Sequence, residues 1–309
     1  MTRPDVVAIV GPTASGKSAL AERLASELGT SIVSIDAMQV YRGMDIGTAK
    51  SYPQDPGLRL EMVDIADLSD DYSVALFQRD ARMCIDALLG QGRIAVLCGG
   101  TGLYLDAVID EMEFPSGETR GAVRSKYEVI ADREGPETLH KLLEDKDPRS
   151  AALIHPHNVR RVIRALEMSD EGVSYADQNE GLRVRRPHYQ ASIFALVMDR
   201  ARLYRRIDRR VDKMFERGLV EEVEGLLDKG LRDSTTARQA IGYKEVIDAL
   251  DGAITLEEAR ELIKTRTRRY AKRQLSWIRR DGRAQWLDMD ELSEEEAFNR
   301  IVDSVRKGC

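Results

Sequence analysis

The chain has 309 residues, of which 42% are hydrophobic, and a formal net charge of −6. This length and apolar content suffice for a large folded core, which excludes a disordered chain and allows either one large domain or a core with a smaller domain attached. The acidic balance excludes a uniformly basic nucleic-acid-binding protein, although local basic patches remain compatible with it.

The first 29 residues predict a strand, a loop and a helix in succession. Residues 6–10, VVAIV, form a continuous apolar run of the kind that a buried parallel strand needs. After a loop bracketed by glycines, Leu20, Leu24 and Leu28 repeat at helical spacing.

Further strands alternate with helices along the chain. Residues 31–36 predict a second strand, residues 73–89 a helix and residues 93–100 a third strand. A returning core strand is expected at residues 192–198. Strands that alternate with helices imply a mostly parallel sheet covered on both faces, so the predicted fold class is α/β.

The pattern changes between about residues 114 and 187, where charged helical stretches occur without a convincing buried strand. We expect a helical insertion subdomain at residues 115–189, and a catalytic core formed by residues 1–114 and 190–309. Apolar positions recur every three or four residues from residue 203 to residue 227, so the C-terminal part is expected to be mainly helical.

The sequence GPTASGKS at residues 11–18 matches the phosphate-binding pattern G-x-x-x-x-G-K-[ST], and it lies between a strand pattern and a helix pattern as that motif requires. Its glycines permit a close backbone approach that points N–H groups at phosphate oxygens. Lys17 supplies a point charge, Ser18 a magnesium ligand, and the helix N-terminus further positive potential. The segment predicts a P-loop NTPase-like core; whether the phosphate is transferred, hydrolysed or lost as a leaving group remains open.

Asp36 ends the second predicted strand, where P-loop enzymes often place a carboxylate that helps to hold Mg²⁺. A kinase would use it to accept a proton from a hydroxyl or to bind metal, and another transferase would use it to deprotonate an amine. An aspartate at the end of a strand also satisfies turn backbone, so a purely structural cap is the competing interpretation.

The chain resembles the tRNA dimethylallyltransferase family in six segments that follow one another in the family's order: GPTASGKS, SIDAMQVYRGMDIGTAK, GGTGLY, RRVIRALE, RQAIGYKE and YAKRQLSWIRR. The resemblance implies transfer of a five-carbon allylic group from dimethylallyl diphosphate to N6 of the adenosine just 3′ of the anticodon (adenosine-37). It also implies Mg²⁺ as the cofactor and the tRNA anticodon stem-loop as a partner. Ala37 stands where the family usually has serine.

The resemblance assigns a role to each segment. The diphosphate site comprises Gly11, Pro12, Thr13, Ala14, Ser15, Gly16, Lys17 and Ser18, and Ser18 is the metal ligand. The catalytic residues are Asp36 as general base, Lys17, and Thr101 at the reaction channel. The tRNA-binding residues are Asp36, Ala37, Met38 and Gln39 beside the target base, Thr101 at the reaction channel, and Arg124 from the insertion. Two further segments that contact tRNA are Arg160, Arg161, Val162, Ile163 and Arg164, and Arg238, Gln239, Ala240, Ile241, Gly242 and Tyr243.

The implied chemistry accounts for these parts. Ionisation of an allylic carbon–oxygen bond builds negative charge on the departing diphosphate, which backbone amides, Lys17 and Mg²⁺ stabilise. The adenine amine is a poor nucleophile, so a positioned carboxylate that removes its proton is expected to accelerate the reaction by roughly 10²- to 10⁴-fold. The target base must also leave its stack.

Basic segments supply an RNA footprint despite the acidic total. Residues 264–283 hold nine Lys or Arg and one Asp, with Tyr270 and Trp277 interleaved, as a surface that follows phosphates and stacks bases requires. Residues 200–210, RARLYRRIDRR, add a second basic stretch. A helix solvated by its charges is the competing interpretation, and some of the arginines are expected to pair with Glu and Asp.

Cysteine, histidine and hydropathy patterns limit the remaining functions. Cys84, Cys98 and Cys309 show no metal-ligand spacing and predict neither a disulfide framework nor a zinc site. His155 and His157 flank a proline before a helix, where capping or packing is favoured over metal binding. The cysteine pattern fits a reducing cytoplasm. No apolar stretch approaches the roughly 18 residues of a membrane span, so we expect a soluble protein without membrane contact. We also expect a monomer.

Two other functions remain open from the residues alone. A nucleotide or small-metabolite kinase would share the P-loop and the strand-end aspartate, but it would have no use for the basic C-terminal third. An RNA-binding NTPase would hydrolyse nucleotide on RNA binding and leave no covalent RNA product.

Overall fold

The computed structural model describes residues 3–114, 121–182 and 184–307, and Cys309 lies outside them. The chain forms two compact units, Met1–Asp110 together with Pro187–Cys309, and Glu111–Arg186. An isolated bridge pairs Asp110 with Pro187, where the chain leaves and re-enters the first unit. The sequence pattern predicts an insertion at residues 115–189, whereas the second unit runs from Glu111 to Arg186.

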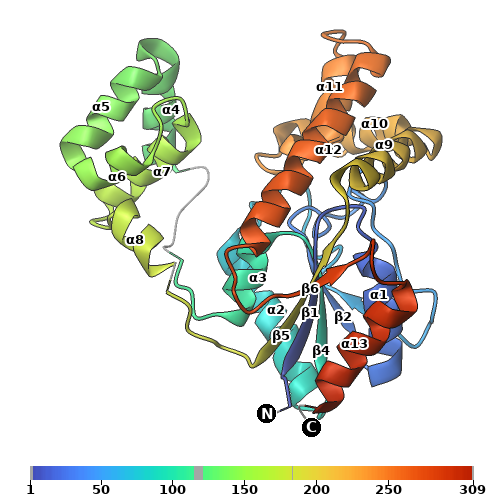
Figure 1. The fold of residues 1–309 in the computed structure, drawn as a ribbon. Helices are drawn as coiled ribbons and strands as arrows, with labels where there is room; N and C mark the ends of the chain where they lie inside the picture. Colours follow the sequence, from blue (N-terminus) through green and yellow to red (C-terminus); the bar gives the residue numbers. More distant parts are fainter. Residues whose placement is uncertain (1–2, 115–120, 183, 308–309) are drawn as a thin grey trace. The chain divides into compact units, whose positions relative to one another are not determined.

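The first unit is built around a six-stranded sheet in the order β3-β2-β4-β1-β5-β6 (Figure 1). All neighbouring strands are parallel, which confirms the predicted α/β class. The strands are β1 (Val6–Val10), β2 (Ile32–Ile35), β3 (Leu60–Glu61), β4 (Ala95–Gly99), β5 (Ala191–Val197) and β6 (Gln285–Asp288). The sequence pattern does not reveal β3, which has two residues, or β6, in which only Leu287 is buried.

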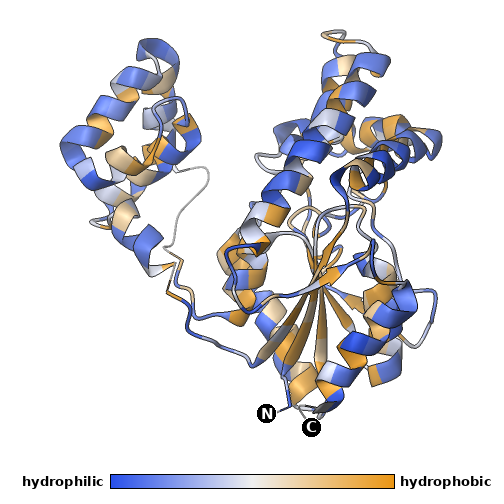
Figure 2. Cartoon of the chain, viewed as in Figure 1, coloured by the Kyte–Doolittle hydropathy of each residue, from blue (hydrophilic) through white to orange (hydrophobic). Residues whose placement is uncertain are grey.

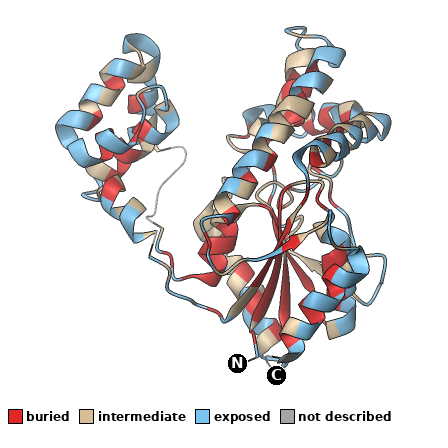
Figure 3. Cartoon of the chain, in the orientation of Figure 1, coloured by how far each residue is buried: buried red, intermediate tan, exposed pale blue. Residues whose placement is uncertain are grey.

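Both faces of the sheet are covered by helices. Side chains alternate between the two faces along each strand, so a continuous apolar strand places apolar side chains on both of them. From β1, Val6, Ala8 and Val10 join the cluster under α2 (Val74–Leu89) and α3 (Gly102–Ile109). Val7 and Ile9 join the opposite cluster under α1 (Lys17–Leu28) and α13 (Glu294–Lys307). The central strands β1, β2 and β4 are accordingly largely apolar and buried (Figures 2 and 3).

Four helices lie beyond the carboxyl ends of the strands (Figure 1). They are α9 (Arg200–Glu216), α10 (Leu219–Leu227), α11 (Tyr243–Leu250) and α12 (Leu256–Ile278). The helical pattern expected over residues 203–227 is divided in two, because Gly218 has a φ of 92° and the chain starts a new helix there.

The described part of the second unit consists of helices and contains no strand, in agreement with its charged helical pattern. Tyr127, Leu139, Leu143, Val162 and Leu166 form its own buried core. The helices are α4 (Ala122–Glu134), α5 (Pro136–Lys146), α6 (Pro148–Leu153), α7 (Val159–Asp170) and α8 (Tyr175–Gly181).

Candidate active site

The P-loop connects β1 to α1 as the motif predicts. Gly16 precedes α1 with a φ of 104°, a left-handed conformation that a residue with a Cβ rarely adopts. The Lys17 ammonium folds back over the loop, where Nζ donates to the carbonyl oxygen of Pro12 at 2.8 Å. Ser18 is exposed in the first turn of α1. The loop therefore presents a helix N-terminus, an ammonium and a hydroxyl on one side.

Asp36 follows β2, and its carboxylate is oriented by backbone amides. Oδ1 accepts from the N–H of Met38 at 2.9 Å and from that of Gln39 at 3.3 Å. Thr101 follows the neighbouring strand β4, and its Oγ1 accepts from the Ala37 N–H at 3.3 Å. Since β2, β4 and β1 are neighbours in the sheet, their carboxyl ends bring Asp36, Thr101 and the P-loop together.

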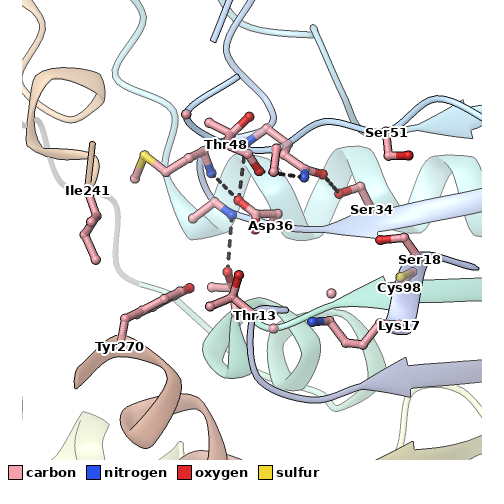
Figure 4. A pocket seen from close by; sticks show the side chains of 18 of the residues that line it. Thr13, Lys17, Ser18, Ser34, Asp36, Thr48, Ser51, Cys98, Ile241 and Tyr270 are labelled. Atoms are coloured by element: carbon pink, nitrogen blue, oxygen red, sulfur yellow. Dashed lines mark hydrogen bonds between the residues drawn. The ribbon is translucent and has the colours of Figure 1, made fainter. Parts of the chain in front are cut away.

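These residues line one cavity of about 440 Å³ in the first unit. In Figure 4, Lys17, Ser18 and Cys98 lie at one end of the view, Ile241 and Tyr270 lie at the other, and Asp36 and Thr13 lie between them. The cavity thus joins an anion-binding end to an end lined by apolar and aromatic side chains, and the carboxylate of Asp36 lies on the path between the two.

Two arginines of α9 complete the P-loop, although the sequence pattern assigns this basic stretch to RNA. Arg206 Nε donates to the carbonyl oxygen of Ala14 at 2.7 Å. Arg210 Nη1 donates to Thr13 Oγ1 at 3.2 Å, and Arg210 lines the cavity. Arg206 and Arg210 lie four residues apart and therefore share one face of α9. This spacing is the only feature of the sequence that indicates a common site for the two.

Helix α12 closes the cavity from a distant part of the chain. Gln274 is buried, and its Oε1 accepts from the Thr13 N–H at 2.8 Å. Trp277 Nε1 donates to Asp106 Oδ2 at 2.8 Å, so the indole N–H has a partner within the protein. Tyr270 lines the cavity, and burial raises the pKa of its hydroxyl to about 12, with a further contribution from Asp36.

The cationic groups of the cavity are poised for an anion. Burial lowers the pKa of Lys17 to about 8, and the nearby guanidinium of Arg210 lowers it as well, against an opposing effect of Asp36. The pKa of Arg210 is also lowered, chiefly by burial. The protein alone therefore does not offset the cost of burying these two positive charges. A diphosphate bound between Lys17 and Arg210 would stabilise the charged form of both side chains.

Cys98 of β4 lies at the same end of the cavity, and it is a residue that the sequence pattern does not assign to the site. Burial raises the pKa of its thiol to about 11, while Lys17 and Ser18 act in the opposite direction. The thiol is neutral at physiological pH and acts as a small apolar wall rather than as a nucleophile.

The segment that precedes α11 supplies another wall. Gln239, Ala240 and Ile241, which belong to the segment expected to contact tRNA, line the cavity. Arg238, in the short helix η2 (Ala237–Gln239), is exposed and donates to the carbonyl oxygen of Arg232 at 3.2 Å. Gly242 and Tyr243 are buried, so Arg238 is the member of this segment that solvent reaches most freely.

The predicted RNA-binding residues of the second unit divide into exposed and buried groups. Arg160 and Arg161 are exposed on α7, whereas Val162 and Ile163 are 0% and 3% exposed in the core of the unit. Arg124 forms a bidentate pair with Glu167 at 2.9 and 3.0 Å, and Arg164 also lies 3.6 Å from Glu167. Arg160 and Arg161 are therefore the exposed members of this set.

About half of the basic stretch at residues 264–283 is structural, as the abundance of acidic residues predicts. Lys264, Arg266, Arg268 and Arg283 form ion pairs with Asp212, Glu245, Asp208 and Asp110, respectively. Within the part of the chain that the structure describes, Arg269, Lys272 and Arg279 are exposed and form no ion pair. Arg273 lines the cavity.

Two features are absent among the described residues. No cluster of three or more of their His, Cys, Asp or Glu side chains is arranged to hold a metal. His155 and His157 are exposed, and their rings stack on each other with centroids 5.4 Å apart. No described helix is long and apolar enough to cross a membrane.

Family models, relatives and solved structures match nearly the whole length of the chain. The IPP transferase family model matches residues 39–281, and the isopentenyl transferase model matches residues 4–58. A tRNA dimethylallyltransferase of Carboxydothermus hydrogenoformans is 46% identical over 96% of each chain. The structure of a tRNA isopentenylpyrophosphate transferase from Bacillus halodurans is 42% identical and covers 98% of this chain and 97% of its own, with a TM-score of 0.72. A eukaryotic dimethylallyltransferase that acts on tRNA is 28% identical, with a TM-score of 0.80 over 98% of this chain and 79% of its own.

Proposed function

We propose that this chain, which belongs to the IPP transferase family, transfers a dimethylallyl group from dimethylallyl diphosphate to N6 of adenosine-37 in the anticodon stem-loop of tRNA and releases diphosphate. The observation that carries the proposal is the cavity that contains the P-loop at one end, Tyr270 and Ile241 at the other, and Asp36 between them. Such an arrangement suits a donor and an acceptor that meet at one carboxylate.

The phosphate is a leaving group in this reaction. When the allylic C–O bond breaks, its electron pair goes to the diphosphate oxygen, and the charge develops beside Lys17, Arg210 and the N-terminus of α1. These groups are held in place before the reaction by Pro12 and Thr13, so little reorganisation is needed as the charge forms. Binding of the diphosphate favours the protonated form of Lys17.

Asp36 is the base that accepts the N6 proton as the new C–N bond forms. Its Oδ1 is held by the Met38 and Gln39 amides, and its Oδ2 makes no hydrogen bond to any described residue. One oxygen therefore fixes the orientation of the carboxylate and the other is available to the amine. Thr101 holds the Ala37 amide and so supports the same turn.

The cavity residues fit a magnesium ion that is bound together with the diphosphate. Ser18 is exposed at the start of α1, and the carboxylates that line the cavity are those of Glu22 and Asp36. Mg²⁺ is commonly held by one or two protein oxygens together with substrate phosphates, which matches this donor set. When bound, the ion would neutralise charge on the departing diphosphate, and Ser18 would be its ligand from the P-loop.

RNA would be bound through exposed cations in both units. The exposed side chains are Arg160 and Arg161 of the second unit, and Arg238, Arg269, Lys272 and Arg279 of the first. Contacts of cations with phosphates supply affinity that depends on salt and carries little sequence information. The protein would act as a monomer in the cytoplasm, where tRNA is present.

The direct experiment is incubation of the protein with dimethylallyl diphosphate and bulk tRNA, followed by digestion and mass analysis of the nucleosides. We expect an adenosine heavier by one dimethylallyl group in place of a hydrogen atom. Label transfer from the γ-phosphate of ATP to an acceptor, without this nucleoside, would instead favour the kinase alternative, which the relatives named above do not support.

A further inference from the structure

We propose that Glu222, on α10, is a positioning residue that clamps two walls of the cavity together and thereby sets the position of the catalytic turn at Asp36. The first wall is the loop at residues 45–49 and the second is the segment at residues 239–241. The inference rests on the proposed function, because it concerns the same cavity, but it assigns a residue that does not line it.

The clamp begins with three consecutive backbone amides that point at one carboxylate. Glu222 Oε2 accepts from the N–H of Asp45 at 3.1 Å and from that of Ile46 at 2.7 Å, and Oε1 accepts from the Gly47 N–H at 3.1 Å. Successive N–H groups that converge in this way form a binding site for an anion. A charged acceptor makes such hydrogen bonds about twice as strong as neutral ones, so the ionised carboxylate is suited to this task.

The same carboxylate holds the second wall through a tyrosine. The Tyr243 hydroxyl donates to Glu222 Oε1 at 2.6 Å, and Tyr243 is buried at the start of α11, just after the cavity-lining segment. The Tyr243 ring packs on Gly47 so closely that a Cβ at that glycine would lie 2.4 Å from a ring carbon. The loop and α11 are thus in direct contact, with Glu222 bonded to both.

A hydrogen-bonded path leads from this clamp to the carboxylate of Asp36. Thr48, next to the clamped amides, lines the cavity, and its carbonyl oxygen accepts from Gln39 Nε2 at 3.2 Å. Gln39 Oε1 accepts from Ser34 Oγ at 2.8 Å, and the Gln39 backbone N–H donates to Asp36 Oδ1. Figure 4 shows Thr48, Ser34 and Asp36 around this path. Release of the loop would remove one of the two side-chain anchors of Gln39.

The chain offers a matched control on the same turn of α10. Glu221 precedes Glu222, carries the same charge and is exposed. Glu221→Gln therefore makes the same change in charge and in side-chain shape without touching the clamp. Tyr243→Phe removes one hydrogen bond and leaves the carboxylate on the loop.

The test compares wild type with Glu222→Gln, Glu221→Gln and Tyr243→Phe in two assays at a temperature at which circular dichroism shows all four to be folded. The first is single-turnover prenylation of an anticodon stem-loop over a series of dimethylallyl diphosphate concentrations that reaches saturation, which gives the maximal rate and the apparent KM for the donor. The second is amide hydrogen exchange of a peptide that spans residues 44–49. The exchange assay does not depend on activity, so an inactive wild-type protein would count against the proposed function and leave the clamp to be judged by exchange.

In Glu222→Gln we expect the single-turnover rate to fall by roughly tenfold to a hundredfold, because misplacement of catalytic groups by about 1 Å has costs of this size. The KM for the donor should stay within about twofold, since the P-loop is untouched, and exchange at residues 45–47 should accelerate. Tyr243→Phe should give a smaller loss of rate, and Glu221→Gln should match wild type in both assays. A wild-type rate in Glu222→Gln, unchanged exchange, or equal losses in Glu221→Gln would overturn the inference.

Discussion

In the proposed reaction Asp36 is both a turn cap and a base, because its two carboxylate oxygens have different surroundings. Oδ1 accepts from two backbone amides, as the structural interpretation of a strand-end aspartate predicts. Oδ2 is left for chemistry, so the two interpretations do not exclude each other. An asparagine would keep the cap and lose the base, which makes this substitution unusually informative.

Lys17 gives the donor site a dependence on pH. Its pKa is about 8 in the free protein, below the usual 10.5, so the ammonium loses its proton as the pH rises above 8. An anionic donor binds the protonated form better, and its affinity should therefore decrease from pH 7.5 to pH 9.5. Cys98 and Tyr270 titrate above this range. Calorimetric titration with a non-reactive thio analogue of dimethylallyl diphosphate measures the effect, and Lys17→Met should remove it. An equal slope in both proteins would show that Lys17 is not responsible.

Lys17→Ala should abolish turnover, because it removes a charge that meets the departing diphosphate. Binding of tRNA should largely survive, since it is proposed to rest on exposed arginines outside the P-loop. Filter binding of labelled tRNA, measured beside the single-turnover rate, separates the two effects. Equal losses of rate and of tRNA affinity would contradict the separation of the two sites.

At the scale of elements, α12 packs closely on Gly100 and Gly102, which have no side chains to obstruct it. A Cβ at Gly102, the first residue of α3, would lie 2.0 Å from the Trp277 ring, and a Cβ at Gly100 would lie 2.1 Å from Gln274. The GGTG segment at residues 99–102 therefore both packs against α12 and contains Thr101. This close approach allows Gln274 to reach the Thr13 amide.

Gly102→Ala should lower the free energy of unfolding by about 1–3 kcal/mol, the usual cost of overpacking. Gly225→Ala is the control, because Gly225 lies inside α10 with nothing within 4 Å of the methyl group that alanine would add, and alanine there should raise stability by up to about 1 kcal/mol. Urea denaturation of the two variants measures both values. Equal stabilities would contradict the close packing of α12 on α3.

The exposed arginines of α7 should contribute to the salt dependence of tRNA binding. Each phosphate contact adds about 0.7 to 0.9 to the slope of log K against log salt. Arg160→Ala combined with Arg161→Ala should therefore make the slope shallower by about one to two units. Arg149→Ala is a control from the same unit, since Arg149 pairs with Asp177. A slope unchanged by the α7 double substitution would remove these residues from the RNA surface.

At the scale of the whole molecule, short-range sequence patterns predict the α/β fold class and, within the cavity, the P-loop and Asp36. Neighbouring residues are enough to predict the strand before the P-loop, the buried positions Leu20 and Leu24 of α1, and the place of Asp36 at the end of a strand. Arg210, Gln274 and Glu222 cannot, because each meets its partner across more than 170 residues of sequence. Their roles depend on how α9, α10 and α12 pack over the strand ends, and no short-range pattern encodes that packing.

The proposed reaction depends most on Asp36, which would deprotonate the acceptor between the two ends of the cavity, one of which would hold the donor diphosphate. The most direct test is single-turnover prenylation of an anticodon stem-loop by wild type and Asp36→Asn across a magnesium series. We predict that Asp36→Asn lowers the rate by about 10² or more at every magnesium concentration, with folding and donor binding near normal. A rate near that of wild type, or recovery of the rate at high magnesium, would contradict the assignment of Asp36 as the general base.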